Sequence, residues 1–275
     1  MENQKRPVCL HFHIYKNAGT TFDNILKRNF SDDALLLDTG KPRGILPFDT
    51  VFHYFSKHHP NVKSLSSHQI RFPIPQNPDY MLLPIVFIRH PIDRAFSIFS
   101  FDKRRNDIPE DIGVEMAKKL SASEYFKWNI GQEDHYIMKN FQVRYLSTKP
   151  PRVKAEPQDL KIAIERIRTP TIVGVVDRMD ESLLVAEEKI KQFFNEIDFS
   201  IVKQNVSKKR KGSLNDRLEN ARLEIGNNIF IKLESANELD LQLYSQANKI
   251  LNDELKKVKH IEEKILDFKK RSKKL

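Results

Sequence analysis

Three apolar runs, each followed by an amphipathic segment, set the pattern of the chain. The runs span residues 8–14, 81–88 and 171–176. The second run is almost continuously apolar, which is typical of a parallel strand buried on both faces. The segment after each run carries apolar residues at helical spacing. This alternation predicts an α/β fold: a three-layer sandwich in which a central, mostly parallel sheet has helices on both faces.

The same periodicity predicts the remaining elements and a single domain. A short strand is expected at 35–37, and helices are expected at 20–30, at 50–60, from Pro91 onward, and at 109–120, 122–128, 133–146, 157–168, 181–195, 215–226 and 235–268. The last helix is charged on most faces beyond Lys256 and is expected to project or fray there. We predict one domain over residues 1–255. It is followed at 256–275 by a charged helix end and a basic tail, of which residues 269–275 are expected to be disordered.

Composition narrows the class of protein. The chain has 275 residues, of which 39% are hydrophobic and 31% charged, so it is long enough to bury a core beneath a polar surface. No apolar run is long enough to span a membrane, and the N-terminus lacks the apolar stretch of a signal peptide. We therefore expect a cytoplasmic protein without a transmembrane segment. The single Cys9 excludes an internal disulfide and is expected to be buried and inert.

The net charge of +10 is concentrated in two short runs. Residues 208–211 contribute four positive charges and residues 269–274 contribute five, so the rest of the chain is close to neutral. This distribution argues against a general nucleic-acid surface, and no nucleic-acid partner is expected. It describes a domain with one basic loop and one basic tail, and such a tail can attract anionic membranes or polymers.

The loop between the first strand and its helix has the composition of an anion-binding site. It reads Tyr15-Lys16-Asn17-Ala18-Gly19-Thr20 and leads into a helix N-terminus, where backbone N–H groups point outward at the positive end of the helix dipole. Lys16 adds a positive charge. Gly19, one of 8 glycines in the chain, allows an anion to approach closely and can adopt dihedral angles that other residues avoid. A structural turn without a ligand is the alternative interpretation.

This loop resembles the 5′-phosphosulfate loop of sulfotransferases that use PAPS (3′-phosphoadenosine 5′-phosphosulfate), especially the carbohydrate-type branch. The usual sequence there is His-Ile-Pro-Lys-x-x-Gly-Thr-Thr, and Tyr15 stands here in place of the proline. The resemblance implies the P-loop NTPase-like fold of those enzymes. It also implies a cofactor site formed by Lys16, Asn17, Ala18, Gly19, Thr20 and Thr21. A Walker A loop has its Lys after the last Gly, an order that this loop lacks.

A second segment resembles the 3′-phosphate motif of the same family. The strand at 81–88 is followed by Arg89-His90-Pro91, and Ser97 stands eight residues after Arg89, which is the spacing of the family motif. An arginine offers a planar fork for phosphate oxygens, and a helical serine two turns on adds a hydroxyl donor. The resemblance implies that Arg89 and Ser97 bind the 3′-phosphate. An ordinary helix start with a salt bridge is the alternative.

The basic run at 208–211 stands where the family has a cofactor-binding loop. Arg210-Lys211-Gly212 is similar to the Arg-Lys-Gly triplet of cytosolic sulfotransferases. The resemblance therefore implies that Lys209 and Arg210 contact the cofactor, with a solvated loop as the alternative.

The resemblance also implies a catalytic base between the two phosphate motifs. In the uronyl-type 2-O-sulfotransferases a His-x-x-aromatic segment supplies it, and residues 67–72, Ser-His-Gln-Ile-Arg-Phe, are similar. Those enzymes often carry another His two residues earlier, where this chain has Ser66. His68 is therefore the candidate base, with a structural histidine as the alternative and with His58 and His59 as rivals outside the match.

Together these motifs predict a PAPS-dependent sulfotransferase. A sulfuryl group would pass in line to a hydroxyl of a carbohydrate or glycoconjugate acceptor, and PAP would be the other product. His68 would accept the hydroxyl proton, while Lys16 and the loop amides would stabilise the leaving phosphate. No metal is expected, because no Cys/His cluster has metal-ligand spacing. The alternatives are a P-loop kinase of a small molecule and a non-catalytic basic binding protein; no motif specifies the acceptor or the oligomeric state.

Overall fold

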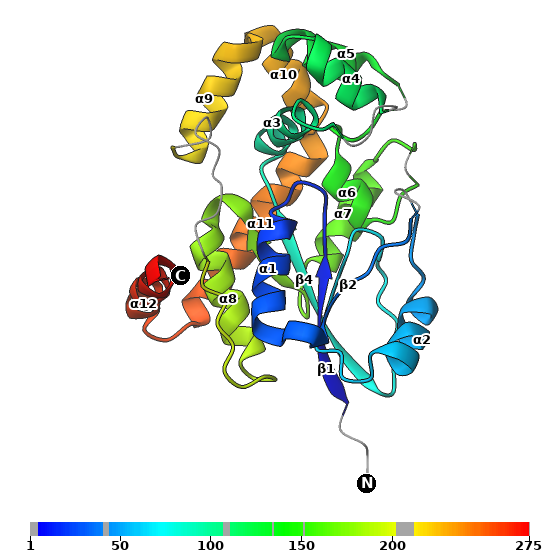
Figure 1. The fold of residues 1–275 in the computed structure, drawn as a ribbon. Coiled ribbons are helices and arrows are strands. Elements are labelled where there is room, and N and C mark those ends of the chain that lie inside the picture. Colours follow the sequence, from blue (N-terminus) through cyan, green and yellow to red (C-terminus); the bar gives the residue numbers. More distant parts are fainter. Residues whose placement is uncertain are drawn as a thin grey trace.

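A parallel β-sheet forms the centre of the protein (Figure 1). The computed structural model describes residues 5–40, 44–106, 111–133, 135–150, 152–201 and 212–274. Within these residues the sheet has five strands in the order β2–β3–β1–β4–β5, and every neighbouring pair is parallel. The α/β prediction is therefore confirmed. The strands are β1 (Arg6–Phe12), β2 (Ala34–Leu36), β3 (Ser64–Ser67), β4 (Tyr80–Ile88) and β5 (Ile172–Val175).

Alternate side chains of the strands point to opposite sides of the sheet. Both sides are apolar, and helices cover both of them. On one face, Val8, Leu10 and Phe12 of β1 are fully buried in a cluster that contains side chains of α2 (Phe48–His58), α6 (Phe141–Leu146), α7 (Pro157–Arg166) and α11 (Glu238–Lys257). On the other face, Cys9 belongs to a cluster with α1 (Gly19–Phe30), α8 (Met179–Ile190) and α12 (Ile261–Lys274). The fold is thus a three-layer sandwich.

A third apolar cluster lies beyond the carboxyl ends of β1 and β4 (Figure 1). Its side chains come from α3 (Pro91–Asp102), α4 (Ile112–Lys119), α5 (Ala122–Gly131), α9 (Leu214–Ile225) and α10 (Asn227–Ser235). Local sequence explains where several of these helices begin. Pro91 occupies the first turn of α3, and Ser121 and Ser213 form capping boxes at the starts of α5 and α9.

The strand order places a crevice at the carboxyl edge of the sheet. The chain leaves β1 toward β2 on one side, whereas it leaves β4 toward β5 on the other, which makes the β1–β4 boundary a topological switch point. The register keeps the strand ends level, since Phe12 lies opposite Ser67 of β3 and Val86 of β4. The loops that follow β1, β3 and β4 therefore emerge together.

Several predicted helix boundaries are wrong, and each error has a local backbone cause. The helix predicted at 133–146 begins only at Phe141, because Asn140 adopts a left-handed conformation (φ 46°). The helix predicted at 235–268 is two helices, α11 and α12, separated by extended Val258 and left-handed His260. The sequence pattern also missed β3 and α10. Among the described residues, no helix combines the length and apolar character needed to cross a bilayer.

The expectation of a projecting helix end and a disordered basic tail is also wrong. Residues 269–274 belong to α12, which packs against α8, and Phe268 is fully buried in the cluster beneath it. Arg271 donates two hydrogen bonds to the buried carboxylate of Glu187, and it also pairs with Asp198 and Asp267. The positive charge counted in the tail therefore contributes in part to holding α12 on the sandwich.

We expect Phe268→Ala to destabilise the whole domain by about 3–5 kcal/mol, because it opens a cavity in a packed core. The measurement is the free energy of unfolding from urea titration. Leu266→Ala, on the same helix but 60% exposed, is the matched control and should have little effect. Equal effects of the two substitutions would mean that α12 does not dock as described.

Candidate functional site

The loop between β1 and α1 forms a tight turn at the carboxyl edge of the sheet. It reverses the chain through two left-handed residues, Lys16 (φ 66°) and Ala18 (φ 62°). Helix α1 starts at Gly19, and the N–H groups of Thr21 and Phe22 donate to the carbonyl of Ala18. Helix geometry leaves the N–H groups of Gly19 and Thr20 without an intrahelical acceptor, at the positive end of the helix dipole. The turn therefore has a backbone geometry that suits an anion, and anion binding stays a prediction.

Two threonines and one lysine complete the turn. Thr20 is exposed, while Thr21 and Lys16 are half-buried. The Lys16 ammonium lies 3.9 Å from the centre of the Phe101 ring, a cation–π distance. The ring therefore helps to hold the charged group against the end of α3.

Gly19 is required for a different reason from the one that the sequence suggested. Its φ angle is not in the left-handed region; Lys16 and Ala18 adopt the strained angles instead. A Cβ atom at Gly19 would lie 1.9 Å from Nε2 of His13, whose ring packs directly on the first residue of α1. The glycine therefore makes room for a histidine.

The side chain of Asn17 faces the protein interior rather than the mouth of the turn. Its Nδ2 donates to the carbonyl of Phe87 and to Oε1 of Gln142, both at 2.7 Å. Its backbone N–H donates to the carbonyl of Ile14. Asn17, expected from the resemblance to bind cofactor, thus serves to fix the loop on the end of β4.

The second motif meets the first directly. Arg89 follows β4, and its Nη1 donates to the carbonyl oxygen of Lys16 at 2.7 Å. Its Nε donates to Asp93 at 2.7 Å, and the other oxygen of that carboxylate accepts from Arg217 of α9 at 2.9 Å. Ser97, two turns into α3, is 8% exposed. The structure therefore brings Lys16 and Arg89 together and adds Arg217, which the sequence pattern did not single out.

His68 lies at the carboxyl end of β3 and is paired with a carboxylate. Its Nδ1 is 2.8 Å from Oδ2 of Asp38, and its backbone N–H donates to Oδ1 of the same residue. Burial acts to raise the pKa of Asp38, but hydrogen bonds from His68 and Ser67 outweigh it and hold that pKa below its ordinary value. Asp38 is therefore ionised at neutral pH and orients the imidazole.

A second histidine–carboxylate pair stacks on the first. The ring of His13 lies 3.7 Å from the ring of His68, centre to centre, with the planes 26° apart. Nδ1 of His13 is 3.1 Å from Oδ2 of Asp23 on α1. In this chain Ser66 stands where the similar motif has a second histidine. In the fold, His13 reaches the same neighbourhood from another strand.

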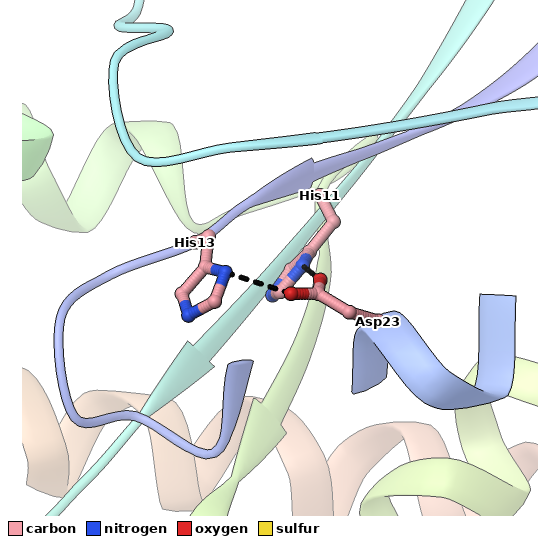
Figure 2. Close-up of side chains that lie close together, drawn as sticks. All are labelled: His11, His13 and Asp23. Carbon is pink, nitrogen blue, oxygen red and sulfur yellow. Dashed lines mark hydrogen bonds and ion pairs between the residues drawn. The ribbon is translucent and has the colours of Figure 1, made fainter. Parts of the chain in front are cut away.

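His11, His13 and Asp23 form a compact cluster under the turn (Figure 2). Nδ1 of His11 lies 3.2 Å from Oδ1 of Asp23 and 2.8 Å from the hydroxyl of Ser66, which donates to the same carboxylate. Burial lowers the pKa of His11 to about 4. Burial acts to raise the pKa of Asp23, but hydrogen bonds from His11 and His13 hold it far below its ordinary value. Folding therefore joins three potential metal-ligating side chains that sequence spacing did not connect, and the expectation that no metal is needed stays a prediction.

A cavity of about 490 Å³ opens beside the two stacked histidines. This size is in the range of small-molecule sites, roughly 300–1,000 Å³. Burial and the neighbouring Asp111 raise the pKa of Asp102 in its wall to about 6. The charged side chains that line it are Asp38, Arg71, Asp102, Arg105, Asp111, Arg144, Lys149 and Arg152.

The two rival histidines lie elsewhere. His58 and His59 are at the end of α2 beside Tyr54, and neither lines the cavity. Lys209 and Arg210 fall outside the described residues.

A comparison with known proteins finds a related protein but indicates no activity. No family model matches the chain. A protein of Archaeoglobus fulgidus is 25% identical over 249 residues, which cover 88% of this chain and 96% of that protein. It is named only as an uncharacterized protein. The similarity therefore extends over most of the chain. It does not indicate which chemistry the site performs.

We expect Gly19→Ala to destabilise the protein by about 1–3 kcal/mol, because the new methyl group cannot share space with the His13 ring. Urea unfolding measures the effect. The control is Gly131→Ala at the end of α5, where an added Cβ meets nothing within 4 Å. If Gly19→Ala is as stable as the wild type, His13 does not pack on α1 in solution.

Proposed function

We propose that the protein is a sulfotransferase that moves a sulfuryl group from PAPS to a hydroxyl of a carbohydrate or glycoconjugate. The observation that carries this proposal is the 2.7 Å hydrogen bond between Arg89 and the Lys16 carbonyl. It joins the two segments that resemble the phosphate motifs of the family, which lie 73 residues apart in the sequence. A cavity with a carboxylate-paired histidine lies at the same edge of the sheet.

The chain's own groups suit a ligand with two separate phosphates. The N–H groups of Gly19 and Thr20, together with Lys16, would hold the 5′-phosphosulfate end. Arg89 and Ser97 would hold the 3′-phosphate. Nε of Arg89 already donates a hydrogen bond to Asp93, and Arg217 offsets the charge of that carboxylate from its other side. The guanidinium is thus aligned before any ligand arrives, which lowers the entropic cost of binding.

The bound donor would supply the sulfuryl group. His68, with Nδ1 held by Asp38, would present Nε2 to the acceptor hydroxyl and take its proton. Lys16 and the amides at the start of α1 would stabilise the negative charge that develops on the leaving phosphate. Each role falls on a residue at the carboxyl edge of β1, β3 or β4, where the fold gathers its loops.

The acceptor would occupy the cavity that His13 and His68 border. Aromatic rings there, among them Tyr136, Phe141 and Tyr145, offer flat surfaces next to charged groups. This mixture suits a sugar ring, which presents apolar C–H faces and hydroxyl edges.

The first test is nucleotide binding. PAP should stabilise the wild-type protein against thermal unfolding, by about 2.7 kcal/mol at a hundred times its Kd, or roughly 5–11 °C. Lys16→Ala should remove most of this shift and reduce sulfate transfer from PAPS by about 10²–10³-fold. Lys27→Ala, an exposed lysine further along α1, is the matched control and should behave as wild type. Stabilisation by ATP with Mg²⁺ but not by PAP would instead favour a kinase.

The second test concerns the base. His68→Ala should lower kcat by about 10²–10⁴-fold, because the acceptor hydroxyl would lose its proton acceptor. The PAP-induced thermal shift should remain, since His68 takes no part in holding the nucleotide. His53→Ala, an exposed histidine on α2, is the control. A His68→Ala enzyme with wild-type kcat would assign the base elsewhere.

A further inference from the structure

We propose that His11, His13 and Asp23 form a binding site for a divalent transition-metal ion of the zinc class. His11 and His13 stand two residues apart in and just after β1, so their side chains point to the same face of the sheet. Asp23 reaches them from the second turn of α1. One ligand atom from each residue lies within 4.8 Å of the others (Figure 2).

The spacing of the ligand atoms suits a small metal ion. Zinc binds imidazole nitrogen and carboxylate oxygen at about 2.0–2.2 Å, so neighbouring ligand atoms of a tetrahedral site lie roughly 3.3–3.5 Å apart. Here Nδ1 of His11 is 3.2 Å from Oδ1 of Asp23, and Nδ1 of His13 is 3.1 Å from Oδ2. One ion could therefore replace the two hydrogen bonds that now join these groups, because the three ligand atoms already lie within 4.8 Å of one another.

The surroundings also resemble those of a metal site. The Ser66 hydroxyl donates to Oδ1 of Asp23, as outer-shell groups commonly do to ligating carboxylates. His13 borders the cavity, which gives an ion a way in and leaves room for water or another ligand in the remaining position. Two imidazoles and one carboxylate favour Zn²⁺, Co²⁺, Ni²⁺ or Fe²⁺ over Mg²⁺ or Ca²⁺, which prefer oxygen ligands.

Coordination would exchange protons for the ion. The metal needs a lone pair on Nδ1 of each histidine, so the hydrogen bonds between these nitrogens and the carboxylate would be replaced by bonds to the metal. Any proton on Nδ1 would leave to solvent or be relocated to Nε2. The aspartate keeps its negative charge and becomes the third ligand.

A bound ion would also act on the proposed reaction. His13 stacks on His68 at 3.7 Å, so an ion held by His13 would fix the ring that packs against the candidate base. This consequence, unlike the site itself, rests on the proposed sulfotransferase function. Zinc would then change the rate of sulfate transfer without displacing the nucleotide.

The site is tested with the metal alone on the full chain. Protein freed of metal by a chelator should bind one Zn²⁺ per chain in a calorimetric titration. Co²⁺ at the same site should give visible absorption bands of a four- or five-coordinate ion. His13→Gln and Asp23→Asn should each weaken Zn²⁺ binding by at least about a hundredfold, because loss even of outer-shell partners costs 10–100-fold. The double variant His58→Ala/His59→Ala, which removes two histidines remote from the cavity, should bind as wild type.

Two outcomes would overturn the proposal. One is a wild-type protein that binds no Zn²⁺; the other is affinity that follows His58 and His59 instead of His13. X-ray absorption of the Co²⁺-loaded wild type should show imidazole and oxygen ligands only. This measurement needs no variant, so the test does not depend on whether a variant folds.

Zinc titration of PAP-induced stabilisation and of sulfate transfer is a separate measurement. If the protein lacks transfer activity, the proposed function fails while the metal site can still be confirmed.

Discussion

A buried amide, the side chain of Gln142, holds the loops after β1 and β4 in one rigid arrangement. Its Oε1 accepts from the side chain of Asn17 and from the backbone N–H of Arg89, while its Nε2 donates to the carbonyl of Arg89. Gln142 and Asn17 are 0% and 1% exposed. A buried donor or acceptor that loses its partner costs about 1–3 kcal/mol, so neither loop can move alone without breaking several such bonds.

The network continues into two buried charges. Asp240 of α11 is fully buried and accepts from the backbone N–H groups of Gln142 and Val143. Burial raises the pKa of Asp240, although the donated hydrogen bonds oppose it. Arg94 of α3, also fully buried, donates to the carbonyls of Tyr15 and Ile137, and burial lowers its pKa to about 10.

Burying charge is costly unless it is hydrogen-bonded, and these two groups offset one another electrostatically across the loop. Here the two buried side chains fix backbone geometry. Asp240 fixes the start of α6, and Arg94 fixes the residue before Lys16. The turn can therefore keep two left-handed residues that would otherwise relax.

The sequence predicts the parts of this molecule that depend on local periodicity and fails where distant segments meet. Strands β1 and β4 and the loops after them follow from apolar runs and from turn residues next to each other in the chain. Strand β3 reads Ser-Leu-Ser-Ser and has too few apolar residues to be recognised, although all four are buried. Gln142 and Asp23 lie in ordinary amphipathic helices, so only the fold reveals that they face the loops. The helix break at Val258 escaped prediction because no glycine or proline marks it.

His13 shows most clearly how these local and distant constraints combine. One ring face stacks on His68, Nδ1 meets Asp23, and Nε2 lies against the backbone of Gly19. The ring thus touches the candidate base, the acidic side chain of α1 and the β1–α1 turn at once. A change in any of these three neighbours therefore acts on a closely packed side chain that is only 9% exposed. His13 therefore links the β1–α1 turn to His68, and the space that its ring occupies explains why a glycine and not merely a small residue starts α1.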